Sequence, residues 1–159
     1  MIDYGTAVQQ AFYTALTPFV SCPVEDGPGQ GDGLDPEEDF PLCVIGESTA
    51  AYMDTDSRLG AEVTMTLHFW SRAAGMKEAR GHMSEAYRAL HREDPTHAKY
   101  KLLSPHLEAE SVDTDPDGET RHGVQTYRVM VWWDSFGSRL GLWSDVDVWD
   151  DNETWDEGA

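Results

Sequence analysis

The sequence predicts a single α+β domain with a mostly antiparallel sheet and two main helices packed on it. A chain of 159 residues with 40% hydrophobic content is long enough for one core and short for two. Apolar residues follow helical spacing in two segments, and they alternate with polar residues in others, in the order helix, strands, helix, strands. We predict this domain over residues 1–139, with an acidic loop at 23–39 and an acidic, Trp-containing C-terminal extension at 140–159.

The first predicted helix lies near the N-terminus. Thr6 and Gln9 have the spacing of a capping box. The apolar stripe that follows consists of Val8, Ala11, Phe12, Ala15 and Leu16. Pro18 ends this helix, because proline lacks the backbone N–H that a helix needs. Residues 23–39 are rich in Pro, Gly, Asp and Glu, and we predict a long exposed loop because they have little apolar surface to bury.

The middle of the chain reads as two strands and a helix. Residues 40–46 form a short apolar run that ends at Gly46 and predicts a buried strand. Residues 61–70 are the clearest strand, because apolar and polar side chains alternate. Its predicted core face is Val63, Met65, Leu67 and Phe69. A second helix is predicted over residues 74–92, ended by Pro95, with one apolar stripe made of Met76, Ala79, Met83, Ala86, Tyr87 and Leu90.

The last third of the domain reads as strands joined by a hairpin. Residues 100–103 and 107–112 are predicted strands interrupted at Pro105, and residues 124–133 are another. One face of this final strand is predicted to carry Gln125, Tyr127, Val129, Val131 and Trp133. Residues 113–118, with the sequence DTDPDG, predict the hairpin turn.

The net charge of −19 is concentrated in two segments. Residues 25–39 contain seven acidic residues and residues 140–159 another seven, and neither segment contains a basic one. The rest of the chain holds the other 16 of the 30 acids and all 11 bases, which is an ordinary balance for a globular domain. Since affinity for phosphate backbones comes from clustered Lys and Arg, this distribution argues against a nucleic-acid-binding face and against anionic membranes.

The sequence also indicates the compartment. Residues 1–4, MIDY, do not resemble a signal peptide, and no apolar run approaches the roughly 20 residues that span a bilayer. We therefore expect a protein of a cytosol-like compartment with no membrane partner. Disulfides are rare there, so Cys22 and Cys43 are predicted to be reduced and buried.

Apparent motifs for chemistry have ordinary structural explanations. Asp113, Asp115, Asp117 and Gly118 resemble the start of an EF-hand loop, but the twelfth position, which must be a carboxylate, is Val124. The six histidines show no metal-ligand spacing, and the glycines of the acidic loop precede no helix that could bind a phosphate. No nucleophile elbow is present. The sequence therefore predicts no enzyme, no cofactor and no metal site.

The acidic C-terminal segment has one feature that a solvated tail does not need. Trp143, Trp149 and Trp155 recur at intervals of six residues. Aromatic side chains are enriched at interfaces, and evenly spaced anchors on an extended segment suit strand addition to a sheet edge. We take these tryptophans as candidate partner contacts, and two surfaces remain open for them: a partner protein such as a neighbouring subunit, or this chain's own core.

Several segments carry a family resemblance through their order and spacing. They are residues 41–47 (PLCVIGE), 60–71 (GAEVTMTLHFWS), 78–80 (EAR), 89–91 (ALH) and 123–128 (GVQTYR). Together they resemble the tail-completion family of tailed phages, which includes tail terminators and tail-to-head joining proteins of long-tailed phages and gene transfer agents. The most specific part is the strand at residues 60–71 followed closely by a helix.

The resemblance runs over roughly residues 8–133 and implies a structural virion protein. It implies a homohexameric ring at the head-proximal end of the tail that terminates growth of the tail tube and joins the tail to the head connector. The implied partners are further copies of the chain, the tail tube protein and the connector or head completion protein, with DNA passing through the lumen without specific binding. Assembly in the host cytoplasm and a final place in the tail or neck of the virion follow, and the family brings no catalytic residues.

Two other function classes stay open on the residues alone. The net charge suggests an acidic mimic of nucleic acid that inhibits a DNA-binding protein, with regularly spaced surface carboxylates. A hydrolase or metal enzyme would assemble its site from distant residues, in a buried polar cluster around His68 or His122. The confinement of the acids to two segments counts against the mimic, and the missing motifs count against the enzyme.

Overall fold

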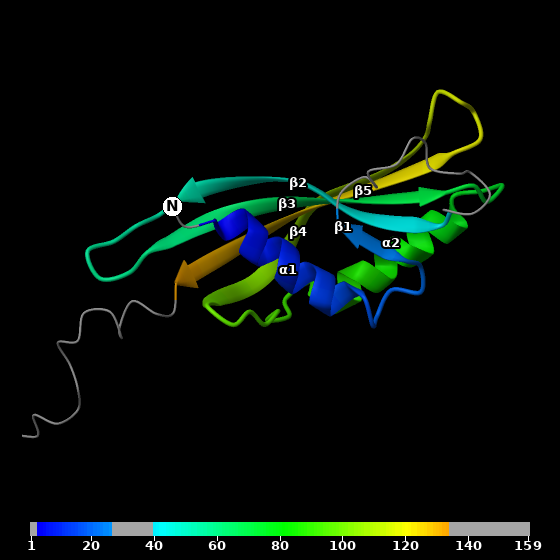
Figure 1. The fold of residues 1–159 in the computed structure, drawn as a ribbon. Helices are drawn as coiled ribbons and strands as arrows, with labels where there is room; N and C mark the ends of the chain where they lie inside the picture. The colour runs from blue at the N-terminus through cyan, green and yellow to red at the C-terminus, as the bar shows by residue number, and fades with distance from the viewer. Residues whose placement is uncertain (1–2, 27–39, 134–159) are drawn as a thin grey trace, which may run out of the picture.

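The computed structural model describes residues 3–26 and 40–133, which form one five-stranded sheet with two helices. The elements are α1 (Tyr4–Leu16), β1 (Val24–Asp26), β2 (Leu42–Tyr52), β3 (Gly60–Ser71), α2 (Lys77–Leu90), β4 (Tyr100–Thr114) and β5 (Arg121–Trp133). The strand order is β1-β2-β3-β5-β4, and all pairs are antiparallel except β1 with β2. Both helices lie on the same side of the sheet (Figure 1). This arrangement confirms the predicted α+β class.

Strand β3 lies at the centre of the sheet, and its alternation places one face in the core. The four apolar side chains predicted for that face are each at most 1% exposed. β5 pairs with β3 from Arg121 to Trp132. It contributes Gln125, Tyr127, Val129 and Val131, all buried, while Trp133 on the same face is half-buried. The buried stripe of α1 packs against the same face, so the core lies between the sheet and the helices.

The N-cap of α1 differs from the prediction. The helix begins at Tyr4, and the cap is Asp3 rather than Thr6. The Asp3 carboxylate accepts hydrogen bonds from the Thr6 backbone N–H at 3.0 Å and from the Thr6 hydroxyl at 2.7 Å. A carboxylate at this position satisfies a free backbone donor and interacts favourably with the positive end of the helix dipole. The helix ends at Leu16, before Pro18, as expected.

Strand β2 is longer than predicted because Gly46 does not end it. The strand continues to Tyr52 through a register shift between Ile45 and Ser48. A Cβ added at Gly46 would come within 2.6 Å of the His68 ring on β3. The glycine therefore allows close approach of a neighbouring side chain instead of marking a turn. The second half of β2 is exposed.

Two further boundaries are corrected by the structure. The start of the predicted acidic loop is β1, which pairs in parallel with Cys43–Ile45 of β2. Residues 27–39 of that loop lie outside the described residues. The two short strands predicted around Pro105 are one strand, β4, with a register shift between Leu103 and His106. A proline is tolerated there because β4 is an edge strand and the shift removes the ladder bond that Pro105 cannot donate.

The turn between β4 and β5 is the predicted hairpin. The Asp117 carboxylate accepts hydrogen bonds from the backbone N–H groups of Glu119 and Thr120 at 2.9 and 2.8 Å. Gly118 has a φ of +77°, which favours glycine. Hydrogen bonds from Thr120 lower the pKa of Asp117 to about 2, so this aspartate is occupied in stabilising the turn.

Helix α2 confirms the second helical stripe with two exceptions. Met76 lies before the helix, at its N-cap position, and is half-buried. Ala79, Met83, Ala86 and Leu90 are buried, but Tyr87 is 41% exposed, so its place in the predicted core stripe is wrong. Cys22 and Cys43 are buried and not disulfide-bonded. Among residues 3–26 and 40–133, no helix has the length and apolarity to cross a membrane.

Candidate assembly surface

The three tryptophans predicted as partner contacts, Trp143, Trp149 and Trp155, lie outside the described residues. Their role therefore stays a prediction. The described residues offer four other features that could contact a partner: a histidine cluster on the open face of the sheet, the two sheet edges, a groove beside α2 and a hairpin with exposed apolar side chains.

The histidine cluster lies on the sheet face opposite the helices. The core-facing residues of β3 alternate with His68 and Trp70, which therefore point away from the core. His68 Nδ1 lies 2.8 Å from His122 Nε2 of β5, and the His122 ring stacks on the Trp70 indole with centroids 3.8 Å apart. His68 Nε2 lies 2.9 Å from a carboxylate oxygen of Glu47. The two imidazoles are 21% and 24% exposed, so the cluster is partly buried.

This environment shifts the titration of two members of the cluster. Burial lowers the pKa of His122, and the adjacent His68 lowers it further, while the nearby carboxylates of Asp115 and Asp113 oppose the shift. The hydrogen bond from His68 lowers the pKa of Glu47. In the bond between the two rings one nitrogen donates and the other accepts, so protonating both rings would break it.

We expect the free energy of unfolding to fall as the pH is lowered from about 7.5 to about 5.5. The pKa of His122 is lower in the folded chain than in the unfolded chain, so the unfolded chain binds more protons over this interval. Burial also lowers the pKa of His91, so this residue contributes to the pH dependence of the free energy of unfolding in the same direction. Urea titrations at several pH values measure the slope. A His122→Gln variant should give a shallower slope, and an identical slope would contradict this origin.

The described polar clusters do not have the geometry of a catalytic or metal site. Among the described residues, no group of three or more His, Cys, Asp or Glu side chains is placed to hold a metal. Ser21, His82 and Glu85 lie together, but the Ser21 hydroxyl and the Glu85 carboxylate both approach Nδ1 of His82, at 3.2 and 3.3 Å. A nucleophile relay needs the hydroxyl and the carboxylate at opposite ring nitrogens.

Among the described residues, the outer edge of β2 has a strand neighbour along only part of its length. β1 pairs only with Cys43–Ile45, so residues 48–51 have β3 on one side and no strand of the described chain on the other. Their side chains are exposed. Edge backbone of this kind is able to pair with a strand of another chain.

In the described part of the chain, the segment after α2 covers the first half of the outer edge of β4. The Arg92 N–H donates to the Pro105 carbonyl at 2.9 Å, and the Ser104 N–H donates to the Asp94 carboxylate at 3.2 Å. The segment after α2 therefore caps the edge near the register shift. Residues 108–114 have β5 as their one strand neighbour in the part of the chain that the structure describes.

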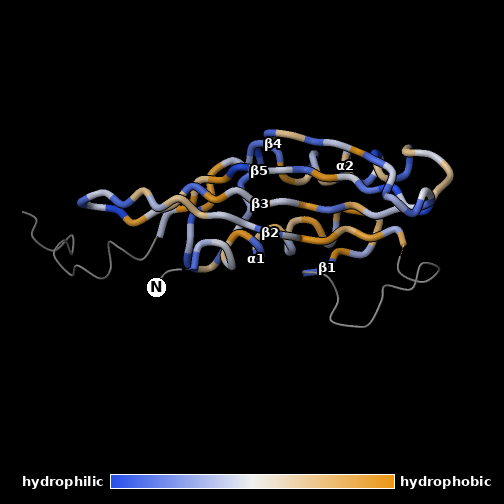
Figure 2. The backbone as a smooth tube through the Cα atoms, turned by 90° about the horizontal axis from the view of Figure 1, so that it is seen from above, coloured by the Kyte–Doolittle hydropathy of each residue, from blue (hydrophilic) through white to orange (hydrophobic). Residues whose placement is uncertain are grey.

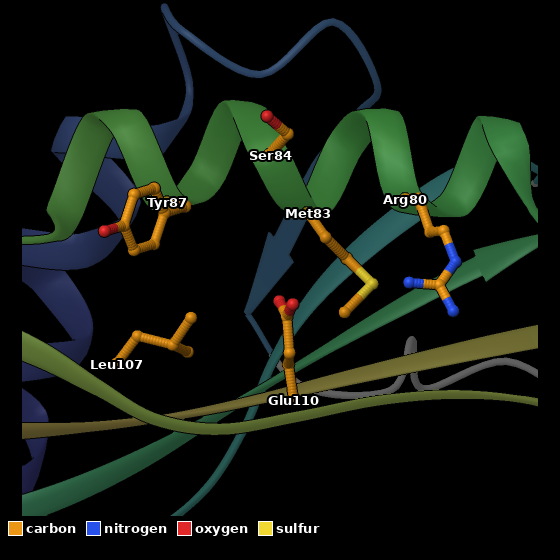
Figure 3. A pocket seen from close by; sticks show the side chains of 6 residues that line it. All are labelled: Arg80, Met83, Ser84, Tyr87, Leu107 and Glu110. Atoms are coloured by element: carbon orange, nitrogen blue, oxygen red, sulfur yellow. The ribbon is translucent and has the colours of Figure 1, made fainter.

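A groove of about 310 Å³ lies between α2 and β4 (Figure 3). Its lining residues are Arg80, Met83, Ser84, Tyr87, Leu107 and Glu110. Behind it lies a buried polar network centred on Gln125, which is 0% exposed. The Gln125 side-chain amide donates to the Met83 carbonyl at 3.0 Å and to the Glu110 carboxylate at 3.1 Å, and Tyr127 donates to the Gln125 side-chain oxygen at 3.1 Å. Through this network, Gln125 of β5 links the α2 side of the groove to the β4 side.

The hairpin between β2 and β3 carries exposed apolar side chains. Tyr52 is 54% exposed and Met53 is 40% exposed. The turn is closed by hydrogen bonds from Met53 N–H to Gly60 at 2.9 Å and from Thr55 N–H to Arg58 at 2.8 Å. Figures 1 and 2 both place this hairpin at one end of the sheet, with α2 toward the other end.

Comparison with known proteins assigns the family. A family model described as tail completion protein gp17 matches residues 24–132. The chain belongs to this tail completion family. A relative named tail completion protein gp17, from Bacillus phage SPP1, is 28% identical over 108 residues, which are 68% of this chain and 75% of that protein. A chain in the virion of a native gene transfer agent particle has the same fold, with a TM-score of 0.68 at 17% identity over 82% of this chain and 99% of that chain.

This tail completion protein is therefore a structural component of the phage tail and not an enzyme. The family match extends from β1 almost to the end of β5, so it includes the histidine cluster, the groove and the hairpin. It confirms the resemblance read from residues 41–47, 60–71 and 123–128. The inhibitor and hydrolase classes that the residues left open are not the class of this family.

Sequence reasoning named part of this surface and missed the rest. It named His68 or His122 only as the possible centre of a buried polar cluster in an enzyme, and the structure brings both rings together in a partly buried cluster of a structural protein. It did not find the groove. A signal was present, because Arg80, Ser84 and Tyr87 have helical spacing and form a second stripe beside the core stripe of α2. The hairpin was missed because Gly46 was read as the end of β2.

Proposed function

We propose that this tail completion protein forms a ring at the head-proximal end of the tail, ends growth of the tail tube and joins the tail to the head connector. The family match over residues 24–132 carries the proposal. Two dissimilar surfaces, the hairpin and the groove, support it because they lie toward opposite ends of the molecule. Contacts between unlike surfaces produce a closed ring when the rotation between subunits closes.

The proposed ring contains six copies, a number that comes from the family resemblance. Its other partners are the tail tube protein on one side and the connector or head completion protein on the other. DNA passes through the lumen without specific binding, since a chain with a net charge of −19 repels a polyanion. We further propose that residues 140–159 form an extension in which Trp143, Trp149 and Trp155 contact a neighbouring subunit or the connector.

Disrupting the gene in the phage tests this function. Electron microscopy of the lysate should show heads and tails that are not joined, with tubes of irregular length, because nothing ends the tube or bridges it to the head. A plasmid copy of the full chain should restore joined particles. If the C-terminal tryptophans contact the connector, a copy truncated after residue 139 should restore tails of normal length but should join fewer of them to heads.

Two outcomes would contradict these statements separately. Joined, infectious particles with tails of normal length in the absence of the protein would contradict the tail-completion function. Full restoration by the truncated copy would contradict the role of residues 140–159 alone, and the ring proposal would stand.

A further inference from the structure

We infer that the β2–β3 hairpin of one subunit docks into the α2/β4 groove of the next subunit and forms the ring contact. This inference rests on the proposed ring and adds which surfaces meet in it. The occupant of the groove is a second copy of this chain, and three properties of the two surfaces support that choice: apolar fit, charge and placement.

The apolar parts of the two surfaces match. The groove offers the Met83 side chain at its floor, with Tyr87 and Leu107 on its walls. The hairpin offers Met53, which is 40% exposed, and the outer face of Tyr52, which is 54% exposed while its ring also meets Tyr4 of its own α1 edge-on. Methionine and aromatic side chains pack favourably against each other, and exposed aromatic groups beside a groove are typical of interface anchors.

One charged residue of the groove is complementary to the hairpin tip. Arg80 lines the groove, and no carboxylate of the described residues lies within 4.0 Å of its guanidinium. Glu110, on the β4 wall, is already bonded to Gln125. The hairpin carries Asp54 and Asp56. Its one basic residue, Arg58, lies over the Trp132 ring at 5.4 Å. The groove lining therefore carries one base and one acid, with Glu110 held on the β4 wall by Gln125. An aspartate of the hairpin tip can pair with Arg80 on the α2 wall, which favours this pairing of surfaces.

The placement of the two surfaces favours contact between subunits. The hairpin follows β2 and the groove is bounded by β4, and these strands lie on opposite sides of the sheet centre in the order β1-β2-β3-β5-β4. The hairpin and α2 also lie toward opposite ends in both views of the fold (Figures 1 and 2). One subunit cannot fill its own groove, so each subunit gives a hairpin to one neighbour and receives one from the other.

Charge reversal tests the pairing. Arg80→Glu and Asp56→Arg should each raise the protein concentration at which rings form by about tenfold or more, because each places like charges in contact. The double variant, with both charges exchanged, should recover most of the loss. Lys77→Glu is the matched control, because it makes the same charge change on α2 but lies beside Ser21 and Glu85, away from the groove. Equal effects of Lys77→Glu and Arg80→Glu, or no recovery in the double variant, would overturn the contact.

Cysteine cross-linking tests the geometry. Ser57→Cys places a thiol in the hairpin turn and Ser84→Cys places one at the groove, while the native cysteines are buried. With a short bifunctional maleimide, the chain carrying both substitutions should give a ladder up to the full ring. A mixture of the two single variants should stop at covalent dimers, because each subunit then has one reactive surface.

The remaining outcomes show whether the proposed contact fails alone or the proposed ring fails with it. Rings seen by light scattering that do not cross-link would overturn the contact and leave the ring proposal intact. Cross-linked dimers from the double variant would indicate a twofold pair and overturn it as well. Cross-linking of Ser84→Cys to Trp149→Cys in place of Ser57→Cys would assign the groove to the acidic C-terminal segment. Monomers at every concentration and on isolated tail tubes would contradict both the ring and the contact.

Discussion

Replacing Tyr127 by Ala is expected to lower the free energy of unfolding by about 3 to 5 kcal/mol, the range for removing a large aromatic side chain from a core. Tyr127 is 0% exposed at the middle of β5, and its ring meets Phe12 of α1 edge-on with centroids 5.9 Å apart. Its hydroxyl donates to Gln125 in the network beneath the groove. The substitution removes the contact between the Tyr127 and Phe12 rings, and it removes one hydrogen-bond partner of Gln125. Urea denaturation followed by circular dichroism measures the loss.

Two control variants separate the contributions to that loss. Tyr127→Phe keeps the ring and removes the hydroxyl, so it should cost about 1 to 3 kcal/mol through the unpaired oxygen of Gln125. Phe19→Ala removes an aromatic ring that is 50% exposed and should cost much less than Tyr127→Ala. A loss below about 1 kcal/mol for Tyr127→Ala, or equal losses at positions 19 and 127, would contradict the described core packing.

The spacing of apolar residues within a segment predicted those elements whose conformation is determined mainly by their own residues. The alternation of residues 61–70 identified β3 and its buried face, and the helical stripe identified α2. The turn at residues 113–118 was predicted because Asp117 and Gly118 favour it through their own side-chain and backbone chemistry. These features depend on residues within one element, so a single sequence contains the information.

The errors arose where a distant residue decides the structure. Gly46 continues β2 because the His68 ring, on another strand, occupies the space of a side chain. β1 is a strand because its three residues pair with Cys43–Ile45, a contact across the acidic loop. Pro105 stays within β4 because that strand forms an edge. The spacing of residues along the sequence does not reveal any of these three long-range contacts.

The candidate surface was predicted unevenly for the same reason. The tryptophans stood out because their spacing is local, yet they lie outside the described residues and their role stays a prediction. The groove depends on how far α2 stands from β4, which is set by the Gln125 network on β5 between them. Arg80 and Tyr87 are recognised as groove residues only in the fold, where Leu107 of β4 lies opposite them.

A closed ring of the purified chain is the second large effect that we expect. One chain has a mass of 17.8 kDa, so a ring of six has a mass of about 107 kDa, six times larger. Each subunit added to an open chain forms one contact, whereas closure forms the last contact without adding a subunit. Closure therefore favours one defined species over a distribution of lengths, and assembly should rise steeply with protein concentration.

Light scattering of the full-length protein across protein and salt concentration, with negative-stain images of the large species, measures the subunit number most directly. We expect one species near about 107 kDa, six times the chain mass of 17.8 kDa, and annular images with a central channel. A monomer or dimer at every concentration, with no annular density added to the ends of isolated tail tubes, would contradict the proposal that this tail completion protein acts as a ring.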